Sequence, residues 1–261
     1  MTVRAIVLSA RRMARAGLAM LLSVLLVLPG CASNQFANTD DPNDPCRPER
    51  AALVSTGDYF AQDIITGAAV GAVAGGLIGG LASGNMRGAA AGALAGGALG
   101  ALGGYWKARQ EQYANDQAAL IRTVYGDIQR DNATIDRTQA AFNRLVACRR
   151  NDAARIRADY RTGRITREQA AAAMAELRSR SDTDLQIARS ISGHIEARSN
   201  DFSYANNQVR STTVRTGRGR GGGGGGATQV QAATSTNLAK REQFEQSIAR
   251  AQNTRSSFEL S

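Results

Sequence analysis

The chain has 261 residues, a formal net charge of +10 and a pI near 10.3. Only 5% of its residues are aromatic and alternating strand patterns are hard to find, which excludes a β-rich fold. All four prolines lie before residue 49, so no proline interrupts a helix after that point. The sequence predicts an all-α protein with a Gly/Ala-rich helical hairpin, long antiparallel coiled-coil-like helices and a flexible Gly-rich segment near the C-terminus.

Residues 1–30 have the features of a lipoprotein signal peptide. Four arginines without an acidic residue precede an apolar run over residues 16–28, which is shorter than the about 20 residues that a membrane span needs. The run ends in Leu28-Pro29-Gly30-Cys31, which resembles a bacterial lipobox. The resemblance implies that Cys31 is acylated, for example with palmitate, and anchors the protein to membrane lipid. The alternative is an ordinary signal peptide and an unmodified Cys31.

The residue after the lipobox bears on the destination. Ala32 stands there, and no aspartate resembles an inner-membrane retention signal. The resemblance therefore implies the outer membrane, with the protein on the periplasmic side. Without the four arginines of the signal peptide, residues 31–261 carry a net charge of +6. In an exported chain we expect no nucleic acid, and anionic lipid head groups or cell-wall polymers are the available counter-charges.

Residues 31–58 are expected to be a tether, because their first twenty positions are rich in Asn, Asp and Pro. Residues 59–106 follow as a hairpin of two uncharged segments, joined by a turn over residues 83–87. Glycines recur every fourth residue in both segments, which forms bare helix ridges suited to close packing. These glycines are Gly67, Gly71, Gly75, Gly79, Gly88, Gly92, Gly96, Gly100 and Gly104.

The environment of this hairpin follows from its glycine content. Thirteen glycines would cost a solvated helix pair on the order of 10 kcal/mol, so close packing or a membrane must compensate. Tyr59 and Phe60 at one end, and Tyr105 and Trp106 at the other, are expected to form one interfacial belt. A flexible linker and a self-associating, fibril-like segment are the alternatives.

The glycine pattern resembles the glycine-zipper two-transmembrane domain of rickettsial surface-antigen lipoproteins and other proteobacterial outer-membrane lipoproteins. The similarity covers about residues 60–106. It implies an envelope lipoprotein that associates with membrane lipid and with copies of itself, and it implies no reaction.

Residues 107–210 are expected to form a helical, coiled-coil-like body. Apolar residues recur at three- and four-residue steps, with a turn at residues 161–165 and a capping box at Thr166 and Gln169. Gly126 is a possible break. The apolar stripe is either the mutual core of two antiparallel helices or a face that binds a partner.

Residues 211–235 are predicted to be a Gly-rich linker, because six consecutive glycines follow an Arg-Gly run. Residues 236–261 are predicted to contain a short C-terminal helix that uses Leu238, Phe244 and Ile248 as its apolar positions.

No catalytic, metal or cofactor site is expected. His194 is the only histidine, and the acidic residues fit solvated helix faces. Cys46 and Cys148 form a possible disulfide in an oxidising compartment, which would close a loop of about 100 residues. Free or intermolecular thiols are the alternative.

The sequence thus predicts a non-enzymatic, lipid-anchored cell-envelope protein with a structural or scaffolding role. Its helical body would act as a periplasmic spacer or binding arm toward a cell-wall or envelope-protein partner. The alternative function is a pore-forming or membrane-permeabilising oligomer built from the same hairpin.

Overall fold

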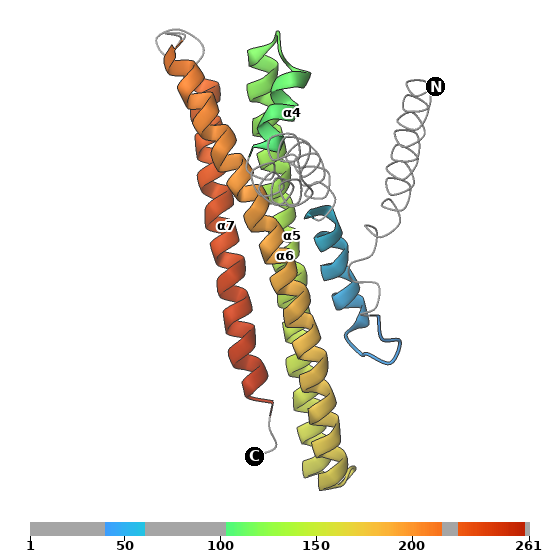
Figure 1. The fold of residues 1–261 in the computed structure, drawn as a ribbon. Coiled ribbons are helices and arrows are strands. Elements are labelled where there is room, and N and C mark those ends of the chain that lie inside the picture. Colours follow the sequence, from blue (N-terminus) through green and yellow to red (C-terminus); the bar gives the residue numbers. More distant parts are fainter. Residues whose placement is uncertain (1–39, 61–102, 216–223, 259–261) are drawn as a thin grey trace, which may run out of the picture. The chain divides into compact units, whose positions relative to one another are not determined.

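The computed structural model describes residues 40–60, 103–215 and 224–258 (Figure 1). Every secondary-structure element in these ranges is a helix, which confirms the all-α prediction. The helices are residues 47–60, α4 (Gly104–Gln112), α5 (Gln117–Arg161), α6 (Arg167–Arg215) and α7 (Gly224–Ser256). The description below concerns the unit of residues 39–261.

The two longest helices, α5 and α6, form an antiparallel hairpin whose turn is encoded locally. Gly163 takes a φ of 71°, the left-handed conformation that glycine tolerates best. Its N–H donates to the carbonyl of Tyr160, and the next N–H, from Arg164, donates to Asp159. These two bonds form a Schellman motif that ends α5.

The predicted capping box then starts α6. The N–H of Gln169 donates to the Thr166 hydroxyl at 3.2 Å, and the N–H of Thr166 donates to the Gln169 side chain at 2.8 Å. Both bonds satisfy backbone donors that the first helical turn leaves without a partner, so this prediction is confirmed.

Helix α7 completes a three-helix body by packing against both α5 and α6. It runs parallel to α5, since Asn132 bonds to the carbonyl of Ala233 and Arg150 bonds to Thr254 further along. Most of the predicted apolar stripe is buried between these helices, so the stripe is their mutual core. Its buried members include Val124, Ile128, Ile135, Phe142, Leu145, Met174, Leu177, Leu185, Ile191 and Ile195.

The C-terminal part of the chain is more helical than predicted. Residues 211–215 belong to α6 and residues 224–235 belong to α7, so the predicted linker is wrong for both ranges. Val230 and Ala233 explain the difference, because both are buried in a core cluster with α5 and α6. The prediction that Leu238 is an apolar packing position of the C-terminal helix is wrong, because its side chain is exposed. Phe244 and Ile248 are buried, as predicted.

Gly126 does not break α5, which continues through it. No helix among the described residues has both the length and the apolar character that crossing a membrane requires. Helix α4 packs against both α6 and α5.

Candidate functional site at the root of the glycine-rich segment

The helix of residues 47–60 ends in a bonded contact with the body. The Tyr59 hydroxyl donates to Oδ1 of Asp131 on α5 at 2.8 Å. Arg198 on α6 donates to both oxygens of the same carboxylate, at 2.6 and 2.7 Å, and its guanidinium lies over the Tyr59 ring. Burial and the Asp131 charge raise the pKa of Tyr59 to about 12, so its hydroxyl stays a hydrogen-bond donor at neutral pH. Phe60 is fully buried beside it.

Helix α4 begins with a matching contact. The Tyr105 hydroxyl donates to Oδ2 of Asp127 on α5 at 2.7 Å, and its ring meets Phe202 on α6 edge to face. Arg109 forms an ion pair with Asp127 at 2.8 Å. Trp106 is buried in a cluster with residues of α5, α6 and α7. The beginning of α4 is therefore part of the body's core.

These contacts place the two ends of the glycine-rich segment at one level of the body. Asp131 and Asp127 are four residues apart on α5, which is about one helical turn. Arg198 and Phe202 are likewise four residues apart on α6. Residues 47–60 and α4 act as two parts of one fourth helix, and residues 61–102 are inserted between them.

This arrangement corrects the predicted interfacial belt. Phe60 and Trp106 are buried in the helical body, and the Tyr59 and Tyr105 hydroxyls bond to carboxylates of α5. The four aromatics do gather at one place, as the hairpin prediction required. The two tyrosines can pack into the body because buried aspartates, Asp131 and Asp127, accept the hydrogen bonds that their hydroxyls would otherwise donate to water.

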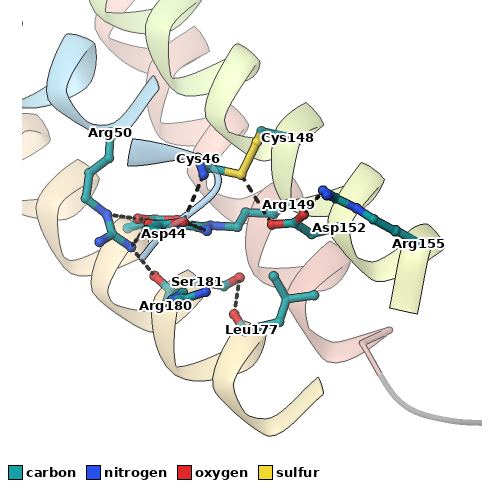
Figure 2. The surroundings of a disulfide bond; sticks show 11 residues. Asp44, Cys46, Arg50, Cys148, Arg149, Asp152, Arg155, Leu177, Arg180 and Ser181 are labelled. Atoms are coloured by element: carbon teal, nitrogen blue, oxygen red, sulfur yellow. Dashed lines mark hydrogen bonds and ion pairs between the residues drawn. A yellow bond between two sulfur atoms is a disulfide. The ribbon is translucent and has the colours of Figure 1, made fainter. Parts of the chain in front are cut away.

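A second bonded region holds the start of the fourth helix. Arg149 on α5 donates two hydrogen bonds to Asp44, at 2.6 and 2.7 Å (Figure 2). It donates two more to Asp184 on α6, at 2.7 and 3.4 Å. Arg50 completes the set by pairing with Asp184 at 2.7 Å and with Asp44 at 3.0 Å. All four side chains are buried and their formal charges cancel. We call these residues the ionic quartet.

The quartet keeps its charges inside the protein through mutual hydrogen bonding. Burial alone would raise the pKa of the Asp44 carboxyl, but hydrogen bonds from Arg149 and from the Cys46 N–H lower it below its ordinary value. Burial likewise opposes the charge of Arg149, yet its bonds to Asp44 and Asp184 raise its pKa. Both groups are therefore ionised across the neutral range.

A disulfide between Cys46 and Cys148 lies next to the quartet (Figure 2). It joins residues 102 positions apart, so it ties the start of the fourth helix to α5. Oδ2 of Asp152 lies 3.5 Å from the Cys46 sulfur, which has no proton to donate in the disulfide, and ligand atoms of the three residues lie within 4.8 Å of one another. Sulfurs bonded to each other are not thiolates, so this trio is not a metal site in the oxidised protein.

The predicted tether is corrected in its second half. Residues 47–58 are helical, and Asp44, Cys46 and Leu53 are buried. The disulfide and the ionic quartet hold residues 44–50 against α5 and α6, so this part of the chain is not a free spacer. Residues 31–39 of the predicted tether lie outside the described residues.

Most other predicted site residues also lie outside the described residues, namely Cys31 and the zipper glycines from Gly67 to Gly100. Gly104 is described, and it is the first residue of α4. His194 on α6 is partly buried, its Nδ1 has no hydrogen-bond partner, and burial lowers its pKa.

Sequence reasoning missed the buried charged residues that fix residues 44–60 and α4 to the body. We call the two ends of the inserted segment, at Tyr59 and Tyr105, its root. Sequence reasoning assigned the acidic residues to solvated faces, but Asp44, Asp127, Asp131 and Asp184 are buried. Where the bond links two different helices, the arginine partner stands 18 to 134 positions away, as for Arg109 with Asp127 and Arg50 with Asp184. Helical spacing carries no signal for such pairs. Only a charged residue at a core position of the heptad pattern, such as Asp131 between Ile128 and Ile135, gives a hint.

Comparison with known proteins bears on the inserted segment. No curated protein and no solved structure matches the chain. Residues 66–111, under a fifth of the chain, match a family model described as a glycine zipper, of the Omp type. The chain therefore carries a glycine zipper domain of the kind associated with membranes, and its C-terminal end overlaps α4.

Proposed function

We propose that this protein is a non-enzymatic, lipid-anchored protein of the bacterial cell envelope that associates with the membrane through its glycine zipper. The observation that carries the proposal is the glycine zipper match at residues 66–111, inserted into the fourth helix of a helical body. The body supplies a rigid base, and the inserted segment supplies the surface that packs against lipid or another helix.

The contacts at the root support a structural role. Two tyrosine–aspartate bonds and a buried tryptophan join both ends of the insertion to α5 and α6. The disulfide and the ionic quartet fix the chain that leads back toward Cys31. Force applied at a lipid anchor or at the zipper is thereby passed to the whole body, as a scaffold requires.

Localisation in the outer membrane, with the body in the periplasm, is part of this proposal. The lipobox-like sequence at Cys31 and the following Ala32 support it. Within such an envelope, the zipper glycines favour self-association and the basic body favours an anionic cell-wall or envelope partner.

Expression in a Gram-negative host tests the anchor. We expect wild-type protein in the outer-membrane fraction, with mass spectrometry showing an acylated residue 31. Cys31→Ser should lose the acyl mass and shift the protein out of that fraction, while Cys46→Ser should keep both the lipid and the fraction. Unacylated wild-type protein in the soluble fraction would contradict the proposal.

The pore-forming alternative makes a different prediction for purified protein. Dye-loaded vesicles should stay intact when the acylated protein binds them, if the role is structural. Release of dye in proportion to bound protein would favour a permeabilising oligomer instead.

A further inference from the structure

The inserted segment begins and ends on one side of the helical body. That side is formed by residues 47–60 and α4, and we call it the root flank. Tyr59 and Tyr105 fix the two ends of the insertion there, on carboxylates one turn apart on α5. Anything that the insertion binds must therefore come close to the root flank.

The connections between the zipper and the root flank are short. The glycine zipper match starts at residue 66, and the helix of residues 47–60 leaves only five residues before it. Five residues reach at most about 18 Å when fully extended. At the other end, the match runs to residue 111 and so includes most of α4.

The body extends in both directions from the root. From Asp127 to the start of α5 at Gln117 is about 15 Å, and from Asp131 to its end at Arg161 is about 45 Å. A body that stood on its end would hold the root away from the membrane surface. A root placed part-way along the body instead brings the body's side to that surface.

The first described residues of the chain, which lead back toward Cys31, contact the body near the start of the helix of residues 47–60. Asp41 bonds to Arg180 on α6 and Asp44 bonds to Arg149, which lies 18 residues along α5 from Asp131. That spacing is about 27 Å. The exposed side chains of the root flank are mostly small or uncharged, and only three of them are charged: Arg47, Pro48, Ala51, Ser55, Lys107, Ala108, Gln110, Glu111 and Gln112. Arg47 is paired with Asp40.

We propose that the body lies along a lipid surface with its root flank against the head groups, instead of standing away from the membrane as a spacer. This inference rests on the proposed membrane association of the zipper and adds the orientation of the body. Both connections leave the body on one side, about 27 Å apart along α5, so a body that lies on that side brings both of them to the lipid surface.

Fluorescent labels on single added cysteines test the orientation. Ala51→Cys and Ala108→Cys place a label on the root flank, and Ala239→Cys places it on α7, where the side chain is also exposed. The acylated full chain, with its native disulfide oxidised, is bound to vesicles of phosphatidylethanolamine and phosphatidylglycerol. Some of the lipids carry a nitroxide quencher on the head group, which reports contact with lipid and not with a second copy of the protein.

We expect several-fold stronger quenching at residues 51 and 108 than at residue 239, for chains that float with the vesicles. Equal, weak quenching at all three positions in floating protein would overturn the flat orientation but leave membrane association intact. Stronger quenching at residue 239 would also overturn it. Protein that does not float would instead contradict the proposed function.

Discussion

At the scale of single residues, the protein buries several charges that each have more than one partner. Asp131 accepts bonds from Tyr59 and Arg198, and Asp44 accepts bonds from Arg149 and from the Cys46 backbone. Such groups add little net stability over apolar residues, but removal of one partner leaves the others buried and unpaired. They specify which segments meet, which suits a chain that must return to one place after a 42-residue insertion.

Arg149→Ala is expected to lower the free energy of unfolding by about 3–5 kcal/mol, because it leaves two buried aspartates with Arg50 as their remaining quartet partner. Urea denaturation measures the change. Arg150→Ala is the matched control: Arg150 is exposed and bonds to Thr254, so its loss should cost less than about 1 kcal/mol. Equal losses in the two variants would contradict the role of the quartet.

The raised pKa of Asp201 on α6 makes the stability of the fold depend on pH. Burial raises its pKa to about 7, against the attraction of Arg198, and its Oδ1 has no hydrogen-bond partner. The folded protein therefore holds this proton more tightly than the unfolded chain does, so stability falls as pH rises from about 4 to about 7. The pKa of Asp44 is lowered, so its contribution is lost only as pH falls below its ordinary value of 3.8.

Asp201→Asn should remove the loss of stability between about pH 4 and about pH 7, because asparagine does not ionise. We expect the variant to be more stable than the wild type at pH 8, by roughly 1–3 kcal/mol after screening by solvent, and nearly equal to it at pH 4. Unfolding curves at the two pH values supply the comparison. A constant difference between the two proteins across this range would contradict the assigned pKa.

At the scale of elements, glycines have opposite roles in two helices. Gly126 is the tenth residue of α5, and apart from the neighbouring helix backbone no atom lies within 4 Å of where its Cβ would stand. A Cβ on Gly226 would instead come within 2.9 Å of an Ile121 methyl group. Gly126→Ala should raise stability by up to about 1 kcal/mol, and Gly226→Ala should lower it. Thermal unfolding followed by circular dichroism measures both. Destabilisation by Gly126→Ala would show that α5 is not continuous there.

The same scale shows what sequence reasoning could predict. Helical spacing predicted α5 and α6, and local motifs predicted their turn and the capping box at Thr166, because these signals depend on neighbours within a few residues. The start of α7 was missed because Gly224, Gly225 and Gly226 favour a linker in isolation, and only burial of Val230 and Ala233 offsets them. The helix of residues 47–60 was missed because its stabilising bonds come from distant residues such as Cys148 and Asp184.

At the scale of the whole molecule, the glycine zipper interrupts a helical bundle and does not precede it. Its two ends meet the body one helical turn apart, through Tyr59 and Tyr105. Residues 61–102 are therefore expected to be removable without loss of the body's fold. A connector of about four residues is long enough to bridge one turn from Phe60 to Gly103.

Flotation with vesicles of phosphatidylethanolamine and phosphatidylglycerol tests the central claim most directly. The comparison uses residues 31–261 with Cys31→Ser, so that no acyl chain contributes, with and without residues 61–102. We predict that the chain with the insertion floats with the vesicles and the shortened chain stays in the dense fraction, although both show the same helical content and melting. Equal flotation of two folded proteins, or no flotation of either, would contradict membrane association through the glycine zipper.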